Sequence, residues 1–249
     1  MSAARRRPGG WAETARTIFY ALLIALVVRT FAFEPFNIPS GSMVPTLLVG
    51  DYMFVSKYAY GYSRHSLPWG LPLFDGRVWA GDGPERGDVV VFKQPGNEKT
   101  DFVKRIIGLP GDTIQVTSGI LTINGQPVER QRIEDYVTAR GGISRSVPQY
   151  IETLPNGRSH PILESRGDDG FYDNTQEYVV PPAHYFAMGD NRDNSDDSRN
   201  LSAVGFIPAD NLVGRAEILF FSSDGSARLW QVWRWPVAIR FSLLFDAIS

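Results

Sequence analysis

Asp101-Phe-Val-Lys-Arg-Ile-Ile107, followed by the turn signal Gly108-Leu-Pro-Gly111, has the pattern of a β-strand that ends at a tight turn. Upstream, Arg86-Gly-Asp-Val-Val-Val-Phe92 is a turn followed by a β-branched run, which is typical of a buried strand. The apolar segments 185–188 and 212–221 have similar patterns, and no long amphipathic helix follows the N-terminal region. These segments predict a mostly β architecture of short strands.

Two further segments favour paired strands. Residues 47–60 have the pattern of two strands around the turn signal Gly50-Asp51, and residues 114–128 that of two short strands with a turn at Asn124-Gly125. Between them, residues 66–83 are rich in Gly and Pro but also hold Trp69 and other large apolar side chains. We expect this loop to pack on the core or to contact a membrane.

The composition changes to a polar one over residues 129–182, where Gly-Gly, Asn-Gly and Asp-Asp-Gly turns are frequent. We therefore expect a smaller inserted cap subdomain over 129–182, between two parts of the main β domain, 34–128 and 183–249. Residues 229–248 are apolar with three tryptophans, which favours a final strand and helix or an interfacial segment, and Pro236 argues against a second spanning helix.

An apolar run near the N-terminus, Ile18 to Val28, follows a group of arginines and resumes at Phe31. We expect an uncleaved transmembrane anchor over residues 17–33, because no small-residue cleavage pattern follows and an arginine-rich flank does not suit a buried helix. A helix from residue 18 to 33 would extend about 24 Å, so Trp11 and Arg29 would complete the span at the interfaces. By the positive-inside rule, the basic residues 1–16 lie in the cytoplasm and the rest of the chain outside.

The composition excludes several functions. The 249 residues have 25 Lys and Arg against 27 Asp and Glu, a formal net charge of −2, which argues against binding nucleic acid through a basic surface. The chain has no cysteine, and its 3 histidines are not at metal-ligand spacing. We therefore expect no metal and no cofactor, and any hydrolytic chemistry must use other groups.

Lys104 is the strongest candidate for such a group. Alternation along a strand places it on one face with Phe102 and Ile106, and places Arg105 on the other face. Burial between apolar neighbours would lower the pKa of the lysine from about 10.4 toward 8, at a cost of about 3 kcal/mol, and would make it a general base. A lysine on an edge strand that prevents aggregation is the structural alternative.

Two other motifs contain polar groups. Ser40-Gly-Ser42 follows an extended, proline-containing segment, and its glycine permits a sharp turn that exposes a hydroxyl. For the tripeptide alone, an ordinary Ser/Gly turn is the better explanation. The acidic segment from Gly189 to Arg199 does not have the ligand spacing of a calcium-binding loop. Its alternating arginines and aspartates favour a rigid, internally hydrogen-bonded loop.

Together these motifs resemble those of the bacterial type I signal peptidases. The resemblance is carried, in order behind an anchor, by Pro39-Ser-Gly-Ser-Met-Val-Pro-Thr46, Arg86–Phe92, Val103-Lys-Arg-Ile-Ile-Gly-Leu-Pro-Gly-Asp112 and Gly189-Asp-Asn-Arg-Asp-Asn-Ser-Asp-Asp-Ser-Arg199. It extends from the anchor to about residue 216. It implies a signal-peptidase-like β fold and a serine–lysine endopeptidase that removes signal peptides from exported preproteins, anchored in the bacterial cytoplasmic (inner) membrane with its catalytic domain on the extracytoplasmic face.

The resemblance also assigns roles to individual residues. Ser42 resembles the nucleophile and Lys104 its general base, while Ser40 resembles the hydroxyl that helps to stabilise the oxyanion. Ser195 resembles the serine that orients the lysine, and Asp196, where the family often has a small residue, is expected to point to solvent. The loop-supporting residues would be Asp190, Arg105, Asp197 and Arg199.

A substrate strand would bind between residues 36–39 and 101–103. The residues expected to contact it are Phe36, Ile38, Pro39, Met43, Leu47, Asp101, Phe102 and Val103. The partners would be exported preproteins, membrane lipid and the protein-export machinery, with no nucleic acid. Two alternatives are a self-cleaving serine–lysine regulator, which would carry a DNA-binding head in place of the anchor, and a membrane-tethered binding protein that has lost its chemistry.

Overall fold

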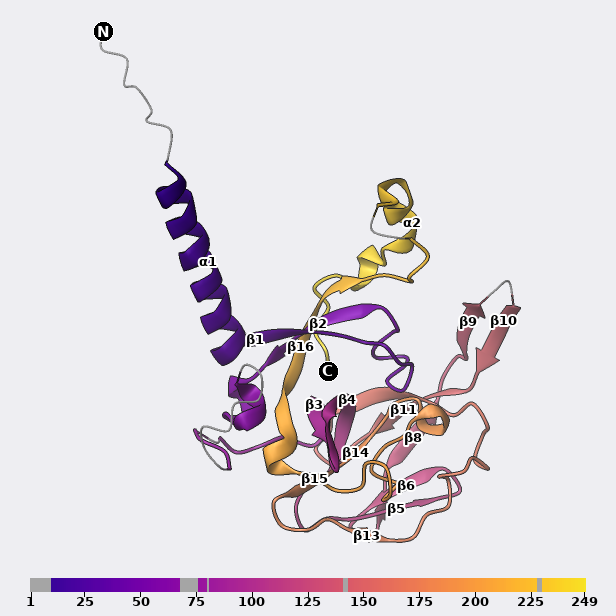
Figure 1. Ribbon diagram of the computed structural model, residues 1–249. Coiled ribbons are helices and arrows are strands. Elements are labelled where there is room, and N and C mark those ends of the chain that lie inside the picture. Colours follow the sequence, from indigo (N-terminus) through magenta and orange to yellow (C-terminus); the bar gives the residue numbers. More distant parts are fainter. Residues whose placement is uncertain (1–9, 68–75, 80, 141–142, 228–229) are drawn as a thin grey trace.

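A curved antiparallel sheet forms the centre of the protein (Figure 1). The computed structural model describes residues 10–67, 76–79, 81–140, 143–227 and 230–249. The sheet has seven strands in the order β1-β2-β16-β3-β4-β14-β15. Their bounds are β1 Phe33–Asn37, β2 Asp51–Ser56, β3 Val89–Gln94, β4 Asn97–Gly108, β14 His184–Met188, β15 Ile207–Pro208 and β16 Leu212–Ser222.

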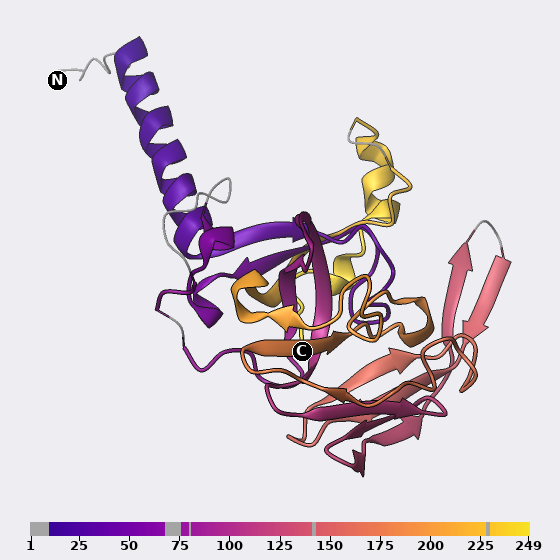
Figure 2. The same ribbon diagram turned by 60° about the horizontal axis from the view of Figure 1, so that its bottom comes forward.

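Smaller sheets extend the body on the side away from the N-terminal helix (Figure 2). A four-stranded sheet has the order β13-β5-β6-β7, a three-stranded sheet the order β12-β11-β8, and β9 pairs with β10. Their bounds are β5 Thr113–Thr117, β6 Ile120–Ile123, β7 Gln126–Pro127, β8 Glu129–Arg132, β9 Tyr136–Arg140, β10 Ile143–Val147, β11 Gln149–Thr153, β12 Ser159–Leu163 and β13 Tyr178–Val179. The mostly β fold expected from the sequence is therefore confirmed.

Alternation along β3 and β4 divides the apolar side chains between clusters. In the pairing of these strands Val90 lies opposite Lys104, and Val91 opposite Val103. Val90 belongs to a buried cluster that also holds Ile106, whereas Val91 belongs to a second cluster against which Val103 packs. Because successive side chains point to opposite faces, one strand pair contributes to two parts of the core.

The N-terminal helix α1, Trp11–Phe31, projects from the body (Figure 1). It is long and apolar enough to span a membrane, with a mean hydropathy of 1.5 and 6% of its 18-residue apolar window buried in the protein. At about 1.5 Å per residue its 21 residues extend about 32 Å, which matches a hydrocarbon core of about 30 Å. The helix begins at Trp11 rather than at 17, and ends at Phe31 rather than at 33, because Phe33 already pairs with Ser56 in the sheet.

The two turns predicted from the sequence are present, but the strands around them differ from the prediction. At Gly50 the chain turns with φ +90°, and of residues 47–60 only 51–56 form a strand, β2. The turn Asn124-Gly125 joins β6 to the short strand β7, and a further turn at Ser118 and Gly119, both with positive φ, joins β5 to β6. Asn-Gly is a recognisable turn dipeptide, whereas the turn six residues earlier was not identified from the sequence.

The C-terminal segment forms an arm rather than a long strand or helix. It contains the short helix α2, Trp235–Ala238, and returns to the sheet through isolated bridges from Ile239 to Ser223 and from Ala247 to Ile218. The arm projects on the same side of the body as α1 (Figures 1 and 2). The loop around Trp69 lies outside the described residues.

Candidate active site

Ser42 and Lys104 meet at the centre of the candidate site. Lys104 Nζ lies 2.6 Å from Ser42 Oγ, although the residues are 62 positions apart. Lys104 comes from the middle of β4, and Ser42 from the turn between β1 and β2. The ammonium lies 5.4 Å from the centre of the Phe102 ring, on the face that strand alternation predicted. The sheet therefore places a hydroxyl and an amine within proton-transfer distance.

Burial changes the acidity of this amine. Lys104 is 3% exposed, and desolvation lowers its pKa to about 8. The carboxylates of Asp197, Asp196 and Asp190 oppose this shift, because each favours the charged ammonium. A substantial fraction of the amine is therefore neutral slightly above neutral pH, and a neutral amine can accept a proton from a hydroxyl.

The loop that follows β14 holds the turn that carries Ser42. The Asn191 backbone N–H donates to the Ser42 carbonyl at 3.0 Å, and its side-chain amide donates to the Gly41 carbonyl at 2.9 Å. Thr46 at the end of the turn donates to Asp190 at 2.5 Å. Asn191 and Thr46 were not singled out from the sequence, although both lie within the quoted motifs.

Asp190 and Arg105 form a buried pair on the face of β4 opposite Lys104. Arg105 Nε lies 2.9 Å from Asp190 Oδ1, and Nη2 lies 2.8 Å from Oδ2. Both side chains are at most 2% exposed. Burial alone would raise the pKa of the Asp190 carboxyl, but the adjacent guanidinium lowers it, so the pair remains charged. Arg105 therefore lies on the face that strand alternation predicted.

A second buried pair stiffens the same loop. Arg199 donates to both carboxylate oxygens of Asp197 at 2.9 Å and to the Arg192 carbonyl at 2.6 Å. Asp197 in turn accepts from the Gly189 N–H at 3.0 Å. Asp196, in contrast, is exposed and accepts from the Asn200 side chain, so it does point to solvent.

Ser195 is buried beside the pair, but the expected hydrogen bond to Lys104 is not formed. The Ser195 hydroxyl has no hydrogen-bond partner among the described residues. The reason is that the Lys104 amine is directed to Ser42, while Ser195 packs against Gly189. A methyl group on Gly189 would lie 2.2 Å from Ser195 Oγ and 2.5 Å from the Ser42 carbonyl oxygen. Only glycine permits this close approach, a role of Gly189 that was not recognised from the sequence.

Ser40 lies at the solvent side of the turn. It is exposed, and its hydroxyl is 3.5 Å from Ser42 Oγ. The Ser42 backbone N–H donates to no other residue in the part of the chain that the structure describes. Both groups are therefore available to a ligand at this edge of the site.

Residues 129–182, for which the sequence predicted a cap subdomain, also contact the loop that follows β14, which the sequence did not indicate. Glu152 on β11 accepts a two-pronged hydrogen bond from Arg192, with side chains 1% and 2% exposed. His160 on β12 lies 3.5 Å from Glu152 and 3.9 Å from Asp190, and burial lowers its pKa to about 4, so it is neutral at neutral pH. Glu152 and His160 carry no local motif, because their partners lie far along the chain.

Five of the eight residues expected to contact substrate gather around one core cluster, whereas Phe102 packs against another cluster and Pro39 and Asp101 are exposed. Ile38, Met43 and Leu47 are at most 4% exposed and belong to the cluster against which Phe36 and Val103 pack. Little of their surface is open in this structure. More accessible is a cavity of about 1000 Å³ lined from β1, from the β3–β4 hairpin and from the base of α1, including Phe36, Asp101, Glu34 and Arg29.

The structure combines a β-rich body, a serine next to a buried lysine, and one apolar helix long enough to span a membrane, and this combination fits a membrane-anchored hydrolase. The family model described as "Signal peptidase, peptidase S26" matches residues 11–221, and the chain belongs to this family. It is accordingly an endopeptidase of the signal peptidase I type, which cleaves signal peptides from preproteins, and α1 fits the membrane anchoring of a bacterial enzyme.

Two curated Rickettsia relatives agree with this assignment. Signal peptidase I of Rickettsia canadensis is 42% identical over 85% of this chain and 80% of its own length. Signal peptidase I of Rickettsia typhi is 44% identical over 82% of this chain and 78% of its own length. A crystal structure of a signal peptidase I from Enterococcus faecalis is 26% identical, with a TM-score of 0.33, and covers 54% of this chain and 97% of that chain.

Proposed function

We propose that Ser42 is the nucleophile and Lys104 the general base of signal peptide cleavage. The observation that carries this assignment is the 2.6 Å separation of the two side chains, with the amine buried and its pKa lowered to about 8. A neutral lysine takes the hydroxyl proton as Ser42 Oγ attacks the scissile carbonyl. The resulting ammonium gives that proton to the departing amine, and the Lys104 amine then deprotonates the water that hydrolyses the acyl-enzyme.

The oxyanion of the tetrahedral intermediate would lie at the solvent edge of the turn. The Ser40 hydroxyl and the Ser42 backbone N–H are the donors that we assign to it, because both are available there. Loss of one such donor typically costs about 10²–10³-fold in turnover.

Ser195 is the hydroxyl that we assign to orienting Lys104 during turnover. In the free enzyme the amine interacts with Ser42 Oγ. After acylation Ser42 has no proton to share, so the amine needs another hydrogen-bond partner while it activates water. Ser195, buried at this site with an unpartnered hydroxyl, can supply it. Asp190, Arg105, Asp197 and Arg199 support the loop through the two buried pairs.

The substrate would bind as an added strand between β1 and β4. β1 pairs only with β2, and the part of β4 before Arg105 pairs only with β3, among the described residues. Both strands therefore present free backbone groups, and both line the cavity next to α1. Phe36, Ile38, Pro39, Met43, Leu47, Asp101, Phe102 and Val103 remain the candidates for contacts with the residues before the cut.

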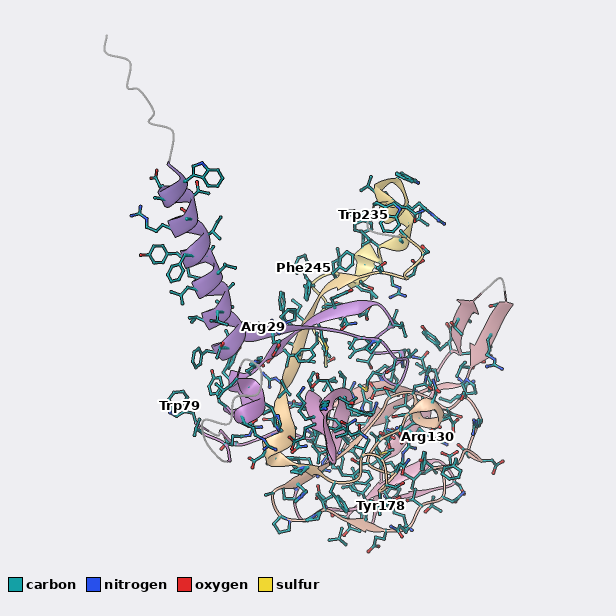
Figure 3. The ribbon with its side chains drawn as sticks, viewed as in Figure 1. Arg29, Trp79, Arg130, Tyr178, Trp235 and Phe245 are labelled. Atoms are coloured by element: carbon teal, nitrogen blue, oxygen red, sulfur yellow. The ribbon has the colours of Figure 1, made fainter. Side chains whose placement is uncertain are left out.

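The enzyme would lie in the cytoplasmic membrane with the residues before α1 inside and the catalytic body outside. The arginines before α1 support this orientation. The C-terminal arm, on the same side of the body as α1, carries exposed aromatic side chains, of which Trp235 and Phe245 are labelled in Figure 3. We assign to this arm a contact with lipid headgroups, since tryptophan favours the membrane interface. Preproteins would arrive from the protein-export machinery.

A processing assay with a purified preprotein in detergent tests the dyad. Lys104→Ala and Ser42→Ala should each lower cleavage by about 10⁴-fold or more, because each removes one half of the proton-transfer pair. Ser144→Ala is the control, because Ser144 is an exposed serine on β10 that does not line the cavity. Turnover within tenfold of the parent in a folded Ser42 or Lys104 variant would falsify the assignment.

A further inference from the structure

Three carboxylates from separate parts of the chain lie close together at the loop that follows β14. They belong to Glu164, Asp173 and Asp193, and one oxygen of each lies within 4.8 Å of the others. Glu164 and Asp173 lie between β12 and β13 in the inserted segment, whereas Asp193 lies in the loop between Asp190 and Ser195. The cluster therefore joins the inserted segment to the loop that supports the dyad.

The cluster has unused acceptors in a buried position. The Glu164 side chain is 1% exposed, and its Oε2 has no hydrogen-bond partner among the described residues. Asp193 Oδ1 is also buried and unpartnered there. A methyl group on Gly170 would lie 1.8 Å from Asp193 Oδ1 and 2.8 Å from Asp173 Oδ2, so the missing side chain leaves the backbone close against both carboxylates.

Nearby cations act on these groups only from a distance, without direct hydrogen bonds. In the described part of the chain, no lysine or arginine side chain donates a hydrogen bond to any of the three carboxylates. Arg130 (labelled in Figure 3) lies 3.9 Å from Glu164 but directs its hydrogen bonds to Gly119 and Asp168. The guanidinium of Arg192 is held by Glu152. The existing contacts are the backbone N–H groups of Gly170 to Asp173 and of Arg166 to Asp193.

Glu164 and Asp173 are buried and Asp193 is half-buried, so little water separates the three carboxylates. Carboxylates this close together repel one another unless a proton or a cation lies between them. A proton on Glu164 alone would leave the other two carboxylates facing each other. A hard divalent cation would neutralise more of this charge, and carboxylate oxygens are its preferred ligands.

We propose that Glu164, Asp173 and Asp193 bind a divalent cation such as calcium, which links residues 164–173 to the loop that follows β14. This departs from the sequence-based expectation of no metal site. The ion takes no part in peptide hydrolysis, because the cluster contacts neither Ser42 nor Lys104. It stabilises the position of Asp193, and with it the loop that runs on to Ser195.

Direct binding of calcium chloride tests the site. Full-length protein in detergent, freed of metal by a chelator and dialysed against labelled calcium, should bind one equivalent with a dissociation constant of about 0.1–1 mM, as expected for a site with few protein ligands. Glu164→Gln and Asp193→Asn should each weaken binding at least about tenfold. Asp169→Asn is the matched control: Asp169 is exposed and outside the cluster, and this variant should bind like the parent.

Thermal unfolding gives a second measurement that separates binding from misfolding. At 10 mM calcium chloride the parent and Asp169→Asn should melt several degrees higher, on the order of 4 °C. Glu164→Gln should show no such rise, yet it should melt no lower than the metal-free parent, because the substitution removes repulsion. Absence of calcium binding by the parent, or equal binding by Glu164→Gln, would overturn the proposal. Either result would leave the assignment of the dyad unaffected.

Discussion

Lys104 Nζ and Ser42 Oγ lie 2.6 Å apart across the interface between β4 and the turn after β1. The two residues depend on different supports. Lys104 is fixed by the pairing of β4 with β3, whereas Ser42 is fixed by hydrogen bonds from Asn191 in the loop after β14. Catalysis should therefore depend on the protonation of the amine and, separately, on the position of the turn.

The pH profile should report the protonation of Lys104. Because only the neutral amine can act as base and its pKa is about 8, activity should rise with pH through that value. At pH 7 about one tenth, and at pH 6 about one hundredth, of the enzyme would be in the active form. Initial rates of preprotein cleavage at low substrate concentration, measured from pH 5.5 to 10, should follow this curve. A flat profile between pH 6 and 8 would contradict the role of Lys104 as base.

Asp196→Asn should move that profile to lower pH. Asp196 is exposed, and its carboxylate raises the pKa of Lys104, because a negative charge favours the ammonium. Removal of this charge should lower the lysine pKa, so that more of the amine is neutral at a given pH below 8. Asp169→Asn makes the same chemical change at an exposed position that does not influence Lys104, and its midpoint should match that of the parent. A shift of Asp196→Asn toward higher pH would disprove the argument.

Local patterns sufficed to predict much of the fold. β3 and β4 follow from their β-branched runs and bounding turns, and α1 from the apolar run that starts at Ile18. The turn at Gly50 was predicted, but the strand expected before it does not form. The two-residue turn at Ser118 and Gly119 was missed, and the isolated bridges of the C-terminal arm have no local sequence pattern.

The candidate site was predictable to a similar extent. Strand alternation alone placed Lys104 and Arg105 on opposite faces, and the resemblance to a family supplied Ser42 as the partner of the lysine. Glu152, His160 and the cluster around Glu164 could not be found in this way. Their functions arise from burial against the loop after β14, and burial between distant segments is a property of the fold rather than of any short motif.

Asp190→Asn should destabilise the protein strongly. The substitution leaves the Arg105 guanidinium buried without its counter-ion and weakens the contact to Thr46, at a cost of about 3–5 kcal/mol. Urea unfolding in detergent measures this loss. The matched control is Glu98→Gln, which breaks a surface ion pair with Arg64. The side chains of Arg64 and Glu98 are 46% and 44% exposed. This control should lower the free energy of unfolding by less than about 1 kcal/mol. Equal losses in the two variants would show that burial does not make the Arg105–Asp190 pair more important for stability than a surface pair.

Gly189→Ala should impair both stability and turnover. The added methyl group would lie 2.2 Å from Ser195 Oγ and 2.5 Å from the Ser42 carbonyl oxygen, so either the catalytic turn or the loop must shift. Overpacking of this kind typically costs about 1–3 kcal/mol, and a displacement of about 1 Å at the nucleophile can lower the rate about 10²-fold. Gly81→Ala provides the control, because a methyl group there would meet only the Ala59 carbonyl oxygen at an ordinary 3.9 Å. Urea midpoints and cleavage rates of both variants should differ accordingly, and parent-like values for Gly189→Ala would show that the turn and the loop are not in the close contact on which the site depends.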